Sequence, residues 1–84
     1  MNQVIHERIM KAYNIFKASG GRISETSDPD ILAGSYFKWA DGDLERAISC
    51  LKTHESNKYI DRPWFEGVTE ARELLESART TPKS

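Results

Sequence analysis

Cysteine is almost absent from this chain, which has Cys50 alone among its 84 residues. One cysteine cannot form an internal disulfide, so the sequence lacks the framework on which small secreted domains depend. Long apolar runs are missing too, and no segment approaches the roughly 20 apolar residues needed to cross a bilayer. The first residues include Glu7 and form no apolar stretch of signal-peptide length. We therefore expect a cytoplasmic protein that has no contact with a membrane.

An excess of charge of one sign is lacking as well, because the formal net charge is −1. A hydrophobic content of 38% beside a charged content of 30% is typical of a soluble globular protein rather than a disordered one. A chain of this length has interior enough for one core. We expect a single domain over residues 1–78, followed by a flexible polar tail over residues 79–84.

The charges are unevenly distributed along the chain. Residues 1–24 are mainly basic, residues 25–45 mainly acidic and residues 46–65 again more basic. The acidic side chains of the middle block are Glu25, Asp28, Asp30, Asp41, Asp43 and Glu45, and the basic ones of the last block are Arg46, Lys52, Lys58 and Arg62. A basic surface can therefore exist on a chain whose total charge is slightly negative.

Apolar residues recur at steps of three and four in the first half, which predicts two amphipathic helices there. The first covers residues 4–19 and ends at Gly20 and Gly21, where the chain can take a left-handed conformation. The second has Asp28 as its N-cap and Pro29 in its first position, and continues for about ten residues. Its predicted inward face consists of Ile31, Leu32, Ser35, Tyr36 and Trp39.

Two further helices are predicted in the second half. The third is the most regular, because Leu44, Ala47, Ile48 and Leu51 follow the spacing of one helix face after a turn at residues 40–43. The fourth covers residues 70–78 with Thr69 as its cap. Its predicted inward side chains are Ala71, Leu74, Leu75 and Ala78.

Between these helices the sequence predicts a short β-hairpin. Tyr59 and Ile60 form the first strand, and residues 61–63 form a turn that contains Pro63. The aromatic and β-branched run from Trp64 to Val68 forms the returning strand. The expected fold is therefore mainly α with a small β-hairpin, in the α+β class.

This order of three helices, a short hairpin and a C-terminal helix resembles the winged-helix group of helix-turn-helix proteins. The run from Asp43 to Ile60 is similar to the third helix of such domains and the first strand of their wing. The run from Gly67 to Glu76 is similar to the passage from the second wing strand into a helix through a threonine cap. The resemblance implies a DNA-binding transcriptional regulator of bacterial or phage type, with its third helix in the major groove. It also implies a homodimer, since paired half-sites multiply affinity.

The outward side of the third helix supplies the side chains that such a protein would use. An arginine can hold guanine through two hydrogen bonds, and serine or threonine can donate to bases or phosphates. Lysines and arginines near the helix end and the wing can contact phosphates. The predicted DNA-contacting residues are Arg46, Ser49, Lys52, Thr53, Lys58 and Arg62. Solvent exposure without any ligand would equally account for these polar side chains.

The acidic start of the third helix favours a second hypothesis, because carboxylates repel phosphates. In this alternative the chain is a protein-interaction module, an inhibitor or adaptor, that binds a partner through its acidic edge or its aromatic hairpin. The residues of that surface are Asp41, Asp43, Glu45, Trp64 and Phe65. Exposed aromatic side chains favour recognition, although at least one of them is expected to close the core.

Enzymatic activity and metal binding have little support in the sequence. Cys50 and His54 are four residues apart and share a helix face, which is half of a zinc site, but two more ligands would be required. The same pair lacks a glycine-rich turn or an evident set of oxyanion donors for nucleophilic catalysis. We therefore expect no catalytic residue, no bound metal and no cofactor.

Overall fold

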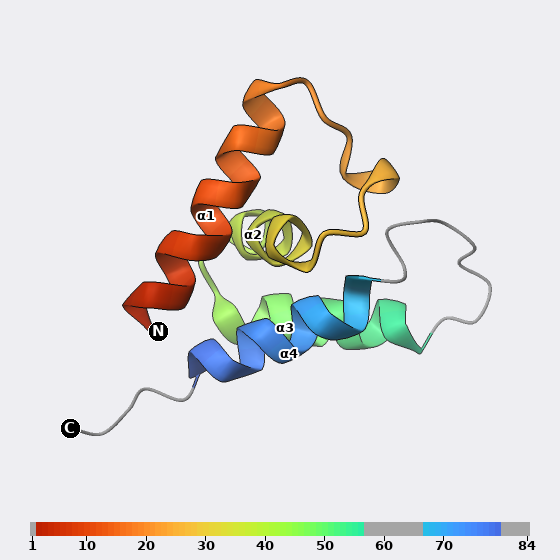
Figure 1. Ribbon diagram of the computed structural model, residues 1–84. Coiled ribbons are helices and arrows are strands. Elements are labelled where there is room, and N and C mark those ends of the chain that lie inside the picture. Colours follow the sequence, from red (N-terminus) through yellow and green to blue (C-terminus); the bar gives the residue numbers. More distant parts are fainter. Residues whose placement is uncertain (1, 57–66, 80–84) are drawn as a thin grey trace.

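The computed structural model describes residues 2–56 and 67–79, apart from the side chain of Ser24. Four α-helices and one short 3-10 helix, η1, make up the regular structure of these residues (Figure 1). Their bounds are α1 Gln3–Ala18, η1 Ile23–Glu25, α2 Pro29–Trp39, α3 Leu44–Glu55 and α4 Val68–Arg79. No helix among the described residues is long and apolar enough to cross a membrane.

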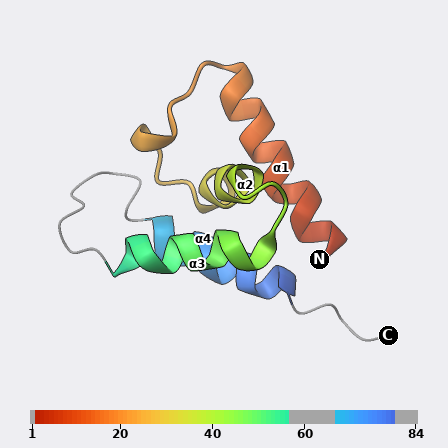
Figure 2. The same ribbon diagram turned by 180° about the vertical axis from the view of Figure 1, so that it is seen from behind.

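The helices pack in two crossed layers. In Figure 1, α2 is seen almost end-on beside α1, whereas α3 and α4 cross the view together below it. The opposite view in Figure 2 brings α3 in front of α4, so these two helices lie side by side and run antiparallel. The backbone N–H of Asn2 donates to the carbonyl oxygen of Ala78 at 2.9 Å, which ties the start of α1 to the end of α4. The N-terminal end of α1 and the C-terminal end of α4 therefore lie next to each other.

Side-chain caps set the starts of the first three long helices. Asn2 Oδ1 accepts from the N–H of Val4 at 2.9 Å, and Asp28 Oδ1 accepts from the N–H of Asp30 at 2.9 Å. Asp43 Oδ1 accepts from the N–H of Arg46 at 3.1 Å. Each bond satisfies a backbone donor that has no partner within the helix. The predicted cap Asp28 and the predicted starts of α2 and α3 are confirmed.

The core lies where α2 meets the other helices. Its fully buried side chains include Leu51 of α3, and Leu75 of α4. The predicted inward faces of α3 and α4 are confirmed, with Leu44 and Leu74 packed partly buried against the core. The buried hydrophobic residues are Ile9, Leu32, Ala33, Ala40, Ala47, Ile48, Leu51, Val68, Ala71, Leu75 and Ala78.

The predicted inward face of α2 is confirmed for Leu32, which is fully buried, and is wrong for Trp39, which is 60% exposed. Leu32 and Trp39 are seven residues apart and share one side of the helix, so they differ in their position along it. Trp39 is the last residue of α2. Another part of α2 makes a close contact with α1: a Cβ atom on Gly34 would lie 2.4 Å from the backbone oxygen of Ile9, so only glycine permits this approach.

The predicted α+β winged-helix fold is wrong, because all regular structure in residues 2–56 and 67–79 is helical. Val68, predicted to end the returning strand, is the first residue of α4, and Thr69 lies within that helix instead of capping it. The physical reason is tertiary packing. A Cβ on Gly67 would lie 2.2 Å from the backbone oxygen of Ser27, and Val68 is fully buried in the helical core. Such packing overrides the β-propensity of a short run.

The connector before α2 and the predicted hairpin region remain to be compared with the sequence. The connector around Ile23, for which the sequence analysis predicted no element, forms the 3-10 helix η1. The predicted strand Tyr59 and Ile60, and positions 64–66 of the returning strand, lie outside the described residues.

Candidate functional site

A hollow of about 330 Å³ opens between α2 and α3. We name it the α2–α3 hollow. It is lined by Ser35, Tyr36 and Trp39 of α2 and by Cys50 and His54 of α3. Ligand pockets of proteins occupy about 300–1,000 Å³, so this hollow has room for only a small group. One or two side chains of another molecule would fill it.

Tyr36 and His54 join the two walls of the hollow. The Tyr36 hydroxyl oxygen lies 2.6 Å from His54 Nδ1 in a hydrogen bond, and the two rings meet edge to face with centroids 5.5 Å apart. Burial raises the pKa of Tyr36 to about 12. The hydroxyl therefore keeps its proton over the whole physiological range, and the wall that it forms is uncharged.

Cys50 lies half-buried in the same wall, and burial raises the pKa of its thiol. A thiol with a raised pKa is a poor nucleophile and a poor metal ligand, because both roles require the thiolate. Among residues 2–56 and 67–79, no three His, Cys, Asp or Glu side chains are grouped so as to hold a metal ion. Cys50 and His54 do share one helix face, as predicted, and they act there as lining side chains of the hollow.

Trp39 lines the hollow, and Arg46 contacts its ring. The indole of Trp39 is 60% exposed, although large aromatic side chains are usually buried in a domain of this size. The guanidinium carbon of Arg46 lies 5.0 Å from the centroid of the indole ring, within the range of a cation–π contact. A planar guanidinium over an exposed ring is a stable arrangement that leaves N–H groups available to a partner.

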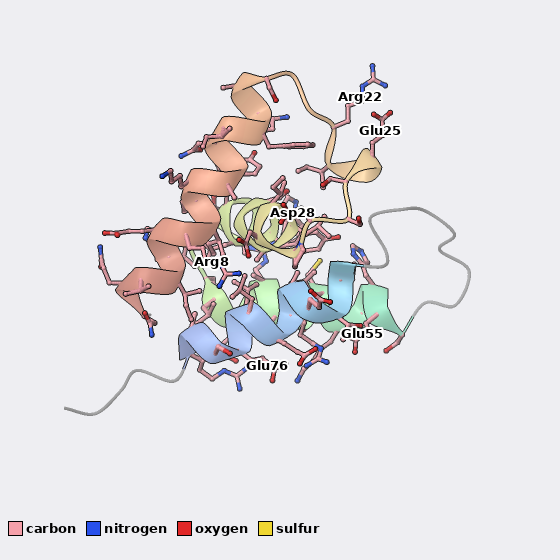
Figure 3. The ribbon with its side chains drawn as sticks, in the orientation of Figure 1. Arg8, Arg22, Glu25, Asp28, Glu55 and Glu76 are labelled. Atoms are coloured by element: carbon pink, nitrogen blue, oxygen red, sulfur yellow. The ribbon has the colours of Figure 1, made fainter. Side chains whose placement is uncertain are left out.

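The acidic side chains of α2 and α3 are held away from the hollow. Glu45 pairs with Arg79 of α4 at 2.7 Å, and Glu55 pairs with Arg72 of α4 at 2.9 Å. Figure 3 shows Glu55 and Glu76 on the α3–α4 side of the molecule. The one acidic residue within α2, Asp30, accepts a 2.9 Å hydrogen bond from Arg8 of α1. No carboxylate lines the hollow as a result.

Four of the six residues predicted to contact DNA lie among the described residues, and all four are exposed on α3. Arg46, Ser49 and Thr53 are exposed on α3, where the Thr53 hydroxyl donates to the Ser49 carbonyl oxygen at 3.1 Å. Lys52 lies toward α4, because its charge helps to lower the pKa of Glu76. The remaining two predicted contacts, Lys58 and Arg62, lie outside the described residues.

The predicted acidic edge is used mainly for structure. Asp43 caps α3, and Glu45 is engaged with Arg79. Asp41 is exposed in the turn between α2 and α3, where its φ of 55° lies in the left-handed region. Trp64 and Phe65, the aromatic residues of the same hypothesis, lie outside the described residues.

Sequence reasoning assigned no site role to Ser35, Tyr36 or Trp39. The signal that could have marked Trp39 is its position, the last residue of α2, directly before a turn. A residue at a helix end is less enclosed by its own helix than one in the middle. Its pairing with Arg46 depends on how α2 crosses α3, and no pattern in the sequence reports that crossing.

Comparisons with known proteins reveal no relative of this chain: no family model, no curated protein and no solved structure matches it.

Proposed function

We propose that this chain is a protein-interaction module that binds a segment of a partner protein in the α2–α3 hollow. The observation that carries the proposal is the exposed indole of Trp39, which lies under Arg46 beside a hollow that no carboxylate lines. Tryptophan, tyrosine and arginine are the residues that contribute most often to hot spots of protein interfaces. All three are present here, since Trp39 and Tyr36 line the hollow and Arg46 lies over the Trp39 ring.

The dimensions of the site support a short segment as the ligand. The hollow would accept one or two apolar side chains, while the flat indole face and the guanidinium lie outside it. An anchor side chain in a pocket, surrounded by contacts that exclude water, is the usual arrangement of a hot spot. The hydrogen-bonded pair Tyr36 and His54 keeps the pocket formed before the partner arrives. Such preorganisation lowers the entropic cost of binding.

A selection from a displayed library of random peptides tests this proposal. The library is selected separately on the wild type, on Trp39→Ala and on Ile15→Ala. Ile15 is a matched control, because it is 60% exposed like Trp39 and lies on α1. We expect peptides that the wild type and Ile15→Ala retain and that Trp39→Ala loses by about 30-fold or more. Peptides retained equally by all three proteins, or by none, would contradict the proposal.

Binding of duplex DNA is a second candidate function, and one observation favours it. The helices α2 and α3 are joined by a four-residue turn that contains Gly42, and α3 exposes Arg46, Ser49 and Thr53. Two helices connected in this way occur in helix-turn-helix proteins. The carboxylates of Asp41, Asp43 and Glu45 at the start of α3 oppose it, since that end would approach the phosphates.

A gel-shift experiment with pooled random duplex at low salt tests the second candidate. If α3 binds DNA, the shift should weaken steeply as salt rises, because bound phosphates release counterions. Arg46→Ala should then reduce binding, whereas Ile15→Ala should leave it unchanged. Absence of a shift at low salt would overturn DNA binding and leave the protein-interaction proposal in place.

A further inference from the structure

The proposed function does not specify the chemistry of the partner segment. The distribution of charge around the hollow indicates which side chains that segment carries. On α3, the two carboxylates Glu45 and Glu55 both lie on the flank that faces α4. The opposite flank, which faces α2, carries Arg46, Cys50 and His54. The carboxylates of α3 are therefore all on the flank toward α4, together with Lys52, and the flank toward α2 has none.

The same division is found on α2. Asp30 is bound by Arg8 on the side that faces α1, and the opposite side presents Ser35, Tyr36 and Trp39 to the hollow. Lys38, the basic residue in the last turn of α2, lies with its ammonium 5.5 Å from the centroid of the Tyr13 ring. Both helices thus keep their carboxylates out of the hollow, although the whole chain has a net charge of −1.

Arg46 is the cation in direct contact with this surface. Its side chain is exposed, and it forms no ion pair with any residue of the described ranges 2–56 and 67–79. By contrast, Arg8 of α1 and Arg72 and Arg79 of α4 are each paired with a carboxylate. A guanidinium stacked on an aromatic ring still offers in-plane N–H donors, and a carboxylate is the ligand that matches their geometry.

We infer that the partner segment is acidic: an apolar side chain enters the α2–α3 hollow, and a neighbouring aspartate or glutamate pairs with Arg46. This inference rests on the proposed function and specifies its ligand. Charge complementarity of this kind selects the partner and raises the rate of encounter. Exposed pairs contribute little energy, so the apolar anchor provides most of the affinity and the acidic residue provides most of the selectivity.

The peptides that depend on Trp39 in the selection provide the probe. Their sequences should be enriched in aspartate and glutamate beside an aromatic or large aliphatic residue. Synthetic copies labelled with fluorescein are compared with versions in which each acid is replaced by its amide. We expect about a three- to tenfold loss of affinity for the amide versions and a similar loss at high salt.

Protein variants complete the test. Arg46→Gln should abolish the difference between the acid and amide peptides, while Arg46→Lys should retain part of it, because lysine keeps the charge without the planar fork. Ile15→Ala serves as the control for general surface changes. A thermal melt of every variant verifies that it is folded.

The outcomes separate the inference from the proposed function. Peptides that depend on Trp39 but bind equally well as acids and amides would overturn the inference and leave the docking site standing. The absence of any peptide that depends on Trp39 would overturn both. Random duplex DNA that displaces the acidic peptides from Arg46 would show that the preference is for phosphate, and would overturn the inference of an acidic protein segment.

Discussion

The guanidinium carbon of Arg46 lies 5.0 Å from the centroid of the Trp39 ring, although the two residues belong to helices that cross at an open angle in Figure 1. This contact connects the last residue of α2 with the first turn of α3 across the turn that contains Gly42. The way the two helices cross therefore leaves the indole exposed and places a cation on it, which are the two features on which the proposed docking site depends.

The Arg46 and Trp39 pair should contribute modestly to stability. A cation–π contact at an exposed site is worth about 0.5–1 kcal/mol. A double-mutant cycle of Arg46→Ala and Trp39→Ala, measured by chemical denaturation, should give a coupling energy in that range. Additive effects of the two substitutions would show that the side chains do not interact in solution.

Truncation of a buried side chain of α3 should lower stability much more than loss of the contact between Arg46 and Trp39. Leu51→Ala should lower the free energy of unfolding by about 2–5 kcal/mol, because Leu51 is fully buried and its truncation leaves a cavity. Val4→Ala is the control, since Val4 is 74% exposed and its truncation should change stability by less than about 0.5 kcal/mol. Thermal melts of the two variants measure the difference, and equal melting temperatures would contradict the placement of α3.

The contact between α1 and α2 should tolerate no side chain at Gly34. The added Cβ of Gly34→Ala would lie 2.4 Å from the Ile9 carbonyl oxygen and 2.8 Å from Tyr13 Cβ, so the helices must separate. Such overpacking costs about 1–3 kcal/mol, against a gain of up to about 1 kcal/mol in helix propensity. We expect net destabilisation in a denaturation experiment. A stabilised Gly34→Ala protein would contradict the close approach of α1 and α2.

The ion pairs between α3 and α4 should make stability depend on pH in the acid range. Hydrogen bonds from Arg72 hold the pKa of Glu55 and the pKa of Glu76 below their usual value. In the unfolded chain a glutamate carboxyl has a pKa of about 4.3, so the ion pairs stabilise the fold fully above that pH. Their contribution is lost as the pH falls through the lower pKa of the folded state.

The variant Arg72→Met measures this contribution while keeping much of the side-chain volume. Its melting temperature should lie below that of the wild type at neutral pH, and the two should converge as the pH is lowered past about 4. A gap between the two melting curves that stays constant down to low pH would show that Arg72 acts by packing and not through Glu55 and Glu76.

The helices themselves were predictable from the sequence for local reasons. Three- and four-residue spacing and the carboxylates of Asp28 and Asp43 determine where α2 and α3 begin, and both signals lie within a few residues of each other. The returning strand was predicted from an equally local signal and was wrong at Val68. There the contact of Gly67 with Ser27, forty residues away along the chain, decides the conformation.

The candidate site was less predictable than the helices. Arg46 was expected to be outward and exposed, and it is, but its partner Trp39 was assigned to the core. The error followed from the position of Trp39, which is the last residue of α2 and is exposed, whereas Leu32 on the same side of the helix is buried. How far along α2 the neighbouring helices cover it depends on tertiary packing, which the periodicity of α2 alone does not report.

Chemical-shift mapping of the labelled protein with one of the peptides that depend on Trp39 is the most direct test of the docking site. We expect the largest shifts at the backbone amides of residues 35–40 and 46–54 and at the indole N–H of Trp39, since these line or border the hollow. The outer face of α1, marked by Ile15, should remain unchanged. Shifts concentrated on α1 or on the outer side of α4, with the amides around Trp39 unmoved, would contradict the proposal that the α2–α3 hollow binds the partner.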